Sequence, residues 1–140
     1  MLLVAFGAVI TGAACDAACG YVFDSITLPC LALLLLISIV SQTLAAFSIG
    51  VLACGGALMI LYTVTRGRGL GLGDVKLACC IGAAAGAVGG VEALGIAFVF
   101  GGAYGAFLLG TGRAQRGAEL RFAPYLAAGT ALIALHGAFV

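Results

Sequence analysis

Apolar residues follow one another in long blocks along this chain, and the few charged residues stand between the blocks. Because a helix that crosses a bilayer needs about 20 mostly apolar residues, the blocks predict membrane-spanning helices. The predicted spans cover residues 1–15, 30–47, 49–65, 75–90, 93–110 and 123–139. No charge separates the second span from the third, so AAFSIG (45–50) is the predicted turn, and GGVE (89–92) divides the fourth from the fifth. The predicted fold is all-α, a polytopic membrane bundle of about six transmembrane helices in a single domain over residues 1–140.

The composition supports a membrane protein. Of the 140 residues 64% are hydrophobic and 8% are charged, whereas about a quarter are charged in a soluble domain. No basic run occurs, so nucleic acid is not an expected partner. The N-terminus lacks the basic region of a signal peptide, although AAC (13–15) resembles a cleavage site. The six cysteines form no CxxC pair, which argues against a structural zinc site and favours packing between helices.

The basic residues predict the orientation. All six lie in, or at the edge of, the connections that follow the third and the fifth predicted span: Arg66, Arg68, Lys76, Arg113, Arg116 and Arg121. Loops rich in Lys and Arg stay in the cytoplasm. Both termini are therefore predicted to lie outside, and residues 16–29 share the cytoplasmic side with the basic connections.

Three aspartates fall on that predicted cytoplasmic side. Asp16 ends the first span, Asp24 lies in the loop after it, and Asp74 begins the fourth span. Ionisable residues are costly in a membrane and often functional there, although Asp24 is equally well explained as a helix end. Small residues recur at steps of four from two of these acids: Ala78, Gly82, Gly86 and Gly90 after Asp74, and Gly12 and Ala8 before Asp16. Such stripes, with a similar notch at Gly101 and Gly105, permit close helix packing.

Two carboxylates held close together share a proton, because both cannot ionise easily. Such a pair can activate a water and donate a proton to a peptide carbonyl, as in aspartic proteases, without metal or cofactor. The glycines at 69, 71 and 73 precede Asp74 directly. They suit a backbone that approaches a substrate strand or adopts dihedrals closed to other residues.

These residues resemble a known family. GLGD (71–74) is similar to the GxGD motif of intramembrane aspartyl proteases, and its continuation VKL (75–77) resembles the GDxKL form of type IV prepilin peptidases. Asp16, followed eight residues later by Asp24 and then by SITLP (25–29), is similar to that family's first motif. RFAPYLAAG (121–129) resembles its C-terminal segment PFGPFLALG. The chain departs from the pattern at Phe23, where the family has proline, and at Ala123, where it has glycine.

The resemblance implies specific roles for these residues. Asp16 and Asp74 would be the catalytic pair, with no metal and no cofactor. The active-site loop would contain Gly71, Gly73 and Lys76. Three further positions would be accessory: Asp24, Pro29 and Pro124.

The implied enzyme is an aspartic endopeptidase of the inner (cytoplasmic) membrane with its active site facing the cytoplasm. It would cut a short basic leader from prepilins, pseudopilins or preflagellins. Its partners would be this substrate and the lipid bilayer, with a homo-oligomer left open. Larger relatives carry a cytosolic segment with paired cysteines and methylate the new N-terminus. This chain resembles the short form without that segment, so methyltransferase activity is not expected.

Two other functions are compatible with the aspartates. A small proton- or cation-coupled carrier could use Asp16 and Asp74 as its ion site, since ionisable residues inside membranes often mark ion paths. A structural subunit of a secretion or adhesion complex would have no chemistry of its own. The carrier does not account for the spacing of the GxGD motif and Lys76, or for the Thr-Leu-Pro block.

Overall fold

The structure, a computed structural model, describes residues 7, 10–11, 24–67, 70–112 and 122–139. These ranges contain helices and no strand, which confirms the all-α prediction. The helices are α2 (Asp24–Val40), α3 (Leu44–Thr65), α4 (Leu72–Gly110) and α5 (Ala123–Phe139). Two helical segments, Leu44–Thr65 and Leu72–Leu108, are long and apolar enough to cross a membrane by length and composition. The first predicted span lies almost wholly outside the described residues, so the count of six spans stays a prediction.

The connection between α2 and α3 differs from the predicted one. The chain turns at residues 41–43, where Gln42 takes a left-handed φ of 56°. Ser41 N–H still donates to Ile37 O at 2.9 Å, whereas Phe47 N–H already donates to Thr43 O at 3.0 Å in the next helix. The predicted turn at 45–50 is therefore wrong, because those residues are helical. The sequence Ser-Gln-Thr (41–43) ends α2. It is polar but uncharged, so a prediction of helix ends from charged residues does not detect it.

The start of α2 also corrects the prediction. Asp24 is the first residue of this helix and does not lie in a loop, so the helix begins well before the predicted start at residue 30. Pro29 lies inside the helix. A proline there removes one backbone hydrogen bond, a cost that the helix tolerates near its first turns more easily than in its middle.

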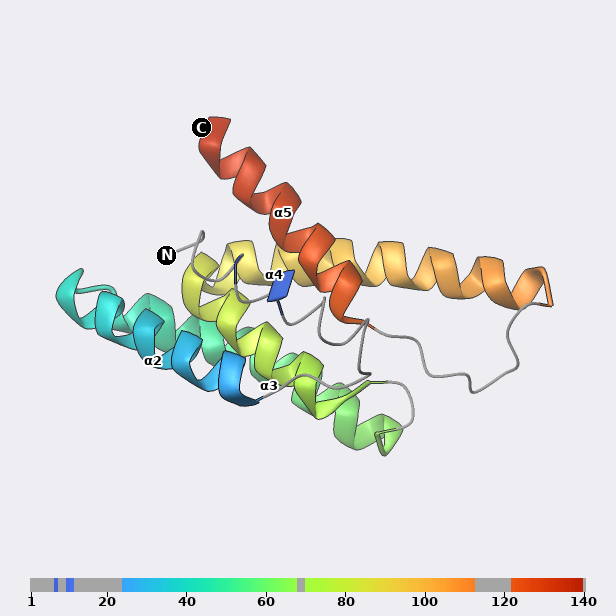
Figure 1. The fold of residues 1–140 in the computed structure, drawn as a ribbon, viewed down its shortest axis with the longest axis horizontal. Helices are drawn as coiled ribbons and strands as arrows, with labels where there is room; N and C mark the ends of the chain where they lie inside the picture. Colours follow the sequence, from blue (N-terminus) through green and yellow to red (C-terminus); the bar gives the residue numbers. More distant parts are fainter. Residues whose placement is uncertain (1–6, 8–9, 12–23, 68–69, 113–121, 140) are drawn as a thin grey trace.

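Helix α4 is bent sharply at Gly86, whose φ of 71° and ψ of −175° are not helical. This conformation is essentially restricted to glycine. The bend divides α4 into a first arm, residues 72–85, and a second arm, residues 87–110, and Figure 1 shows the two arms running in opposite senses. Two helices were predicted here, but the division at residues 89–92 is wrong, because those residues belong to the second arm.

Helix α3 and the first arm of α4 approach so closely that their backbones touch. A Cβ built on Gly50 would overlap the carbonyl of Gly82, and a Cβ on Gly82 would overlap the carbonyl of Gly50. A Cβ on Gly90 would meet the Cys54 thiol and the backbone of Gly82. The predicted stripe of small residues below Asp74 is thus confirmed as a packing face at Gly82 and Gly90, while Gly86 serves as the bend.

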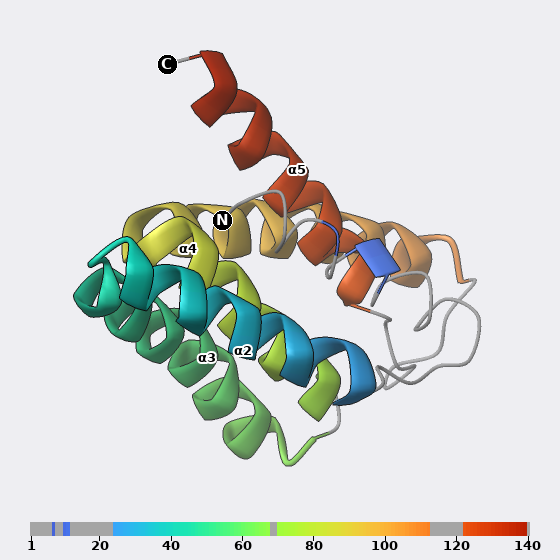
Figure 2. The same ribbon diagram turned by 60° about the vertical axis from the view of Figure 1, so that its left-hand side comes forward.

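Helix α5 packs on the second arm of α4 through two glycines. Gly129 lies against the backbone of Ala93, and a Cβ on Gly101 would come within 3.2 Å of Phe122 and 3.3 Å of Tyr125. From this crossing α5 extends away from α2 and α3, as both ribbon views show (Figures 1 and 2). The predicted notch at Gly101 is therefore a helix–helix contact.

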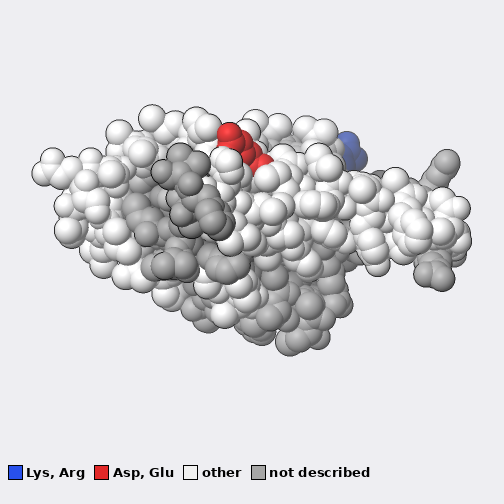
Figure 3. Space-filling model, turned by 90° about the horizontal axis from the view of Figure 1, so that it is seen from above, with Lys and Arg blue, Asp and Glu red and all other residues white. Residues whose placement is uncertain are grey.

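The outer surface is largely apolar. Large hydrophobic side chains are exposed on every described helix, among them Leu36, Leu52, Val64, Val99 and Leu135. On the face in Figure 3, the described residues show one small acidic group and one basic group, and the other described residues there are uncharged. Exposed apolar area on this scale is typical of a surface that contacts a membrane or other proteins.

Candidate active site

Asp74 lies in the first turn of α4 and is 7% exposed. Its Oδ2 accepts a hydrogen bond from the Gly71 N–H at 3.1 Å, and its own N–H donates to Gly71 O at 3.1 Å. This is one half of a capping box, in which an acidic side chain at the third helical position reaches back to the residue that caps the helix. The carboxylate thereby lies at the positive end of the helix dipole, where negative charge is stabilised.

Gly71 lies directly beside the Asp74 carboxylate. Among the described glycines φ is positive at Gly67, Gly86 and Gly112, and not at Gly71 or Gly73. Of the two roles predicted for these glycines, unusual dihedrals are therefore wrong at 71 and 73, and close approach of a substrate strand stays a prediction. A Cβ on Gly71 would lie 3.6 Å from Asp74 Oδ2, so any larger side chain there would start directly beside the carboxylate. Because Gly71 has no side chain, no Cβ occupies this position next to the Asp74 carboxylate.

Lys76 lies two residues beyond Asp74 and is half-buried, whereas Asp74, Val75 and Leu77 are buried. Residues two apart on a helix do not share a face. The difference in burial agrees with the prediction that Lys76 points away from Asp74.

The residues of the first motif are only partly described. Asp16 lies outside the described residues, so its predicted pairing with Asp74 stays a prediction. The backbone of Asp24 begins α2, but its side chain is not among those described, and Pro29 is exposed on the same helix.

The structure gives Thr27, part of the Thr-Leu-Pro block, a position for which the sequence offered no role. Its side chain is fully buried, and its hydroxyl has no hydrogen-bond partner among the described residues. Its carbonyl lies 3.8 Å from the Cys80 thiol of α4, which can donate to it. Leaving a buried hydroxyl unpaired costs about 1–3 kcal/mol. Thr27 therefore lies where α2 contacts the first arm of α4, and its place in the Thr-Leu-Pro block was the sequence signal.

The third motif begins α5. Phe122 O accepts hydrogen bonds from the N–H groups of Tyr125 at 3.0 Å and Leu126 at 3.2 Å. Pro124 is exposed in the first helical turn, where the missing N–H of a proline costs little. Phe122 is buried against Phe98 of α4, with ring centroids 4.8 Å apart. The motif thus has an aromatic residue before Pro124 in the sequence, Phe122, and another directly after it, Tyr125.

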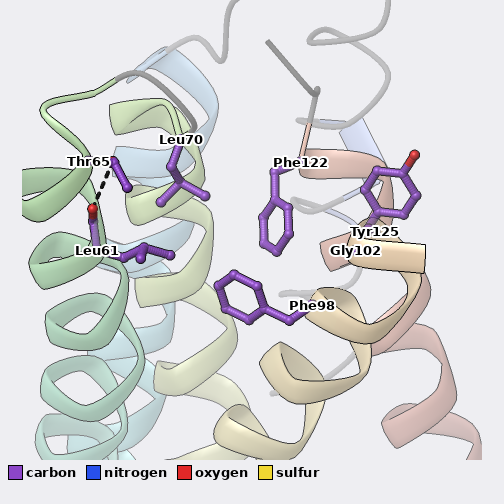
Figure 4. Close-up of a pocket in the computed structure, with 8 residues that line it drawn as sticks. Leu61, Thr65, Leu70, Phe98, Gly102, Phe122 and Tyr125 are labelled. Carbon is purple, nitrogen blue, oxygen red and sulfur yellow. Dashed lines mark hydrogen bonds between the residues drawn. The ribbon is translucent and has the colours of Figure 1, made fainter. Parts of the chain in front are cut away.

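A cavity of about 180 Å³ lies between Leu70, which precedes the second motif, and two residues of the third motif, Phe122 and Tyr125. Figure 4 shows Leu61 and Leu70 pointing into it from one side and Phe98 and Phe122 from the other. Its full lining comes from α3, the segment before α4, the second arm of α4 and the start of α5: Leu61, Thr65, Leu70, Phe98, Gly101, Gly102, Phe122 and Tyr125. Leu70 is the neighbour of Gly71, which binds the Asp74 carboxylate. Sequence analysis missed this cavity because its walls come from four separate segments.

Nothing in the described ranges forms a metal site. No group of three or more His, Cys, Asp or Glu side chains there could hold an ion. The described cysteines are free thiols, and Cys54 and Cys79 pack against glycines of neighbouring helices, as their predicted packing role requires.

Comparison with known proteins identifies the family. Residues 3–106, more than half of the chain, match the model of the type IV leader peptidase family. The chain belongs to the type IV leader peptidase family. The proteins of this family are membrane proteins, which agrees with the long apolar helices α3 and α4. The match contains the first two motifs, at 16–29 and 71–77, and ends before the third.

One curated relative in this leader peptidase family is the prepilin leader peptidase/N-methyltransferase of Bacillus subtilis (strain 168). It is 42% identical over 84 residues, which are 57% of this chain. The aligned part spans about a third, 32%, of the relative's own length. No solved structure matches the chain.

Proposed function

We propose that this chain is a membrane aspartic endopeptidase that removes the leader from prepilins, pseudopilins or preflagellins. Membership of the leader peptidase family and the printed activity of the Bacillus relative support the class of reaction. The observation that carries the proposal is the setting of Asp74: a buried carboxylate in the first turn of a helix, held by the Gly71 N–H and bordered by that glycine.

In the proposed mechanism Asp74 acts with Asp16. Two neighbouring carboxylates share one proton. The Gly71 N–H and the start of α4 both stabilise negative charge on Asp74, so Asp74 is the ionised member and Asp16 carries the shared proton. Asp74 takes a proton from a water as its oxygen attacks the scissile carbonyl carbon, and Asp16 gives its proton to the carbonyl oxygen. When the tetrahedral intermediate collapses, the C–N bond breaks and Asp74 passes its proton to the leaving amine, while Asp16 recovers its own.

The proposed substrate presents a basic leader in the cytoplasm and an apolar helix in the bilayer. The arrangement of the helices supports this geometry. Figure 1 shows α3 ending and α4 and α5 beginning toward one side of the molecule, while the turn after α2 and the bend of α4 lie toward the other. This arrangement supports the proposal that Asp74 lies at the end of the bundle that the basic residues predict to be cytoplasmic.

Cleavage of a co-expressed prepilin, followed by its mobility shift on a gel, tests the proposal. Asp74→Asn keeps an oxygen that accepts the Gly71 N–H, so the protein should still fold and insert, but it removes the base. We expect Asp74→Asn and Asp16→Asn each to lower cleavage by about a thousandfold or more, as loss of one member of a catalytic unit does in other hydrolases.

Asp24→Asn is the matched control, since it makes the same change in the same predicted cytoplasmic segment as Asp16. It should retain at least part of the activity, with enzyme amounts checked by immunoblot. Normal cleavage by both Asp16→Asn and Asp74→Asn would refute an aspartic mechanism. An inactive Asp24→Asn beside an active Asp16→Asn would make Asp24 the partner of Asp74.

A further inference from the structure

Two buried thiols meet where α2 contacts the first arm of α4. Cys30 of α2 is 7% exposed and Cys80 of α4 is fully buried, and both are free thiols. The Cys80 thiol donates to Thr27 O at 3.8 Å and lies in hydrogen-bonding contact with the Cys30 thiol. Two thiols that already meet across a helix contact need little backbone movement to form a disulfide. The proposed cleavage mechanism uses neither of them.

The other two described cysteines are oriented differently. A Cβ on Gly55 of α3 would overlap the Cys79 thiol, and a Cβ on Gly90 would overlap the Cys54 thiol. Each of these thiols therefore fills the space beside a glycine. Cys79 directly precedes Cys80 in α4, so a step of one residue along this helix turns the thiol from α2 toward α3.

The thiol pair joins the helix of the first motif to the helix of the second. Figure 1 shows α2 and the first arm of α4 running in the same direction. Cys30 lies six residues after Asp24, which begins α2, and Cys80 lies six residues after Asp74, in the first turn of α4. Six helical residues span about 9 Å, so the two aspartate positions lie at the same level of the bundle. A bond between the thiols would therefore fix the starts of these two helices relative to each other.

We propose that Cys30 and Cys80 are a reversible disulfide site, oxidised by a lipid-soluble quinone, that ties α2 to the first arm of α4 and slows cleavage. In this step the S–H bonds of both thiols break and one S–S bond forms. The quinone takes up the two electrons and the two protons and becomes the hydroquinone. A dithiol reductant reverses the step by thiol–disulfide exchange.

The surroundings of the pair favour a lipid-soluble oxidant. Cys30 and Cys80 belong to a buried cluster with Leu34 and Ala83, and further apolar side chains pack against it. A charged oxidant such as glutathione disulfide would have to leave water to reach these thiols, and burying a charge is costly. An uncharged quinone dissolved in the bilayer meets no such cost.

The disulfide does not depend on the proposed peptidase function, but its effect on cleavage rests on it. Asp74 is 7% exposed, so a substrate reaches the carboxylate when neighbouring segments separate. Helix α2 packs on α4 through the small cluster that contains Cys30, whereas α3 and α4 touch backbone to backbone at Gly50 and Gly82. Helix α2 is therefore the neighbour that separates more easily, and a disulfide at Cys30 removes this freedom.

Counting free thiols in membranes tests the disulfide. The variant is the full chain with Cys30 and Cys80 kept and the other four of its six cysteines replaced by alanine. After treatment with decylubiquinone, denaturation and tagging with a maleimide polymer, we expect most chains to carry no tag, and to carry two tags after a dithiol reductant. The matched control keeps Cys30 and Cys79 instead. Because the Cys79 thiol faces α3, this control should carry two tags under the same oxidant.

Prepilin cleavage by the wild type gives the second measurement. Decylubiquinone should slow cleavage severalfold, and the dithiol reductant should restore the rate. Cys30→Ala removes one thiol of the pair and touches no residue of the proposed mechanism. It should cleave at about the wild-type rate and should not respond to the quinone.

The outcomes separate the two proposals. Two tags on the chain with Cys30 and Cys80, after decylubiquinone and also after copper(II)–phenanthroline, would overturn the disulfide site. Two tags after the quinone but none after the copper complex would overturn the quinone as the oxidant. An unchanged cleavage rate in oxidised wild type, or a slowed one in quinone-treated Cys30→Ala, would overturn the effect on cleavage. A reduced wild type that cleaves no prepilin would refute the peptidase function, and the thiol count would still decide the disulfide.

Discussion

Gly50 of α3 and Gly82 of α4 contact each other through their backbones, with no room for a Cβ on either residue. The contact lies on the face of α4 that also carries Ala78 and, at the start of the helix, Asp74. Residues four apart share a helix face, so this crossing determines how the first arm of α4, and with it the aspartate, is held against α3. Helix crossings in membranes depend on such small residues, because lipid gives no hydrophobic drive to associate.

Gly82→Ala should therefore destabilise the protein. The new Cβ overlaps the Gly50 carbonyl, so backbone must move, at a cost of about 1–3 kcal/mol. Gly56→Ala in α3 is the control, because a Cβ there meets nothing within 4 Å and alanine favours a helix by about 1 kcal/mol over glycine. Thermal unfolding in detergent should show a lower Tm for Gly82→Ala and an equal or higher Tm for Gly56→Ala. Equal Tm values in both variants would contradict the close crossing.

The bend at Gly86 gives a second prediction. Its φ of 71° and ψ of −175° strain any residue with a side chain, although space for a Cβ is free. Gly86→Ala should lose about 1–3 kcal/mol of stability from backbone strain alone. Gly95→Ala, in the helical second arm of α4, should not lower the stability. If thermal unfolding showed Gly86→Ala to be as stable as the wild type, this would contradict the non-helical, glycine-restricted backbone conformation at residue 86.

Lys76 is expected to assist without being essential. Its half-buried position beyond the buried Asp74 suits a side chain whose stem lies on apolar surface and whose ammonium reaches the membrane interface. We expect it to attract lipid phosphates or an acidic part of the substrate there. Lys76→Ala should slow prepilin cleavage severalfold at a normal protein level, with Lys76→Arg closer to the wild type. Complete loss of cleavage in stably inserted Lys76→Ala would instead assign Lys76 to the catalytic step.

The losses caused by Asp16→Asn and Asp74→Asn should not add. Members of one catalytic unit fail together, so the double variant should be about as inactive as either single variant. Initial rates with purified enzyme in detergent provide the comparison. A double variant that is slower than each single variant by the product of their separate effects would show that the two carboxylates act independently.

Reporter fusions test the orientation. Fusions after residue 67, where α3 has ended, and after residue 115 should report a cytoplasmic position. Fusions after residue 42, in the turn between α2 and α3, and after residue 140 should report an external one. A cytoplasmic C-terminus would overturn the topology and the common face of Asp16 and Asp74.

The site was predictable from sequence to the extent that it is local. Asp74 lies in the first turn of a helix, where a glycine-rich segment is followed by a long apolar block. Its capping contact with Gly71 joins residues only three positions apart. The Thr-Leu-Pro block, in contrast, gave no hint that Thr27 would be buried against Cys80, since 53 residues separate the two. Asp16 and its partner role stay a prediction.

The amino-acid sequence by itself determined that the part of the chain that the structure describes forms apolar helices, because long uncharged blocks can satisfy their backbone in lipid only as helices. The sequence also determined that Asp74 lies at the N-terminal end of α4. Tertiary structure alone decided where the helices turn and bend, as at Gln42 and Gly86, because glycine and uncharged polar residues are compatible with a helix as well as with its end. It alone made the cavity, because Leu61, Leu70, Phe98 and Phe122 meet only when α3, both arms of α4 and α5 pack together.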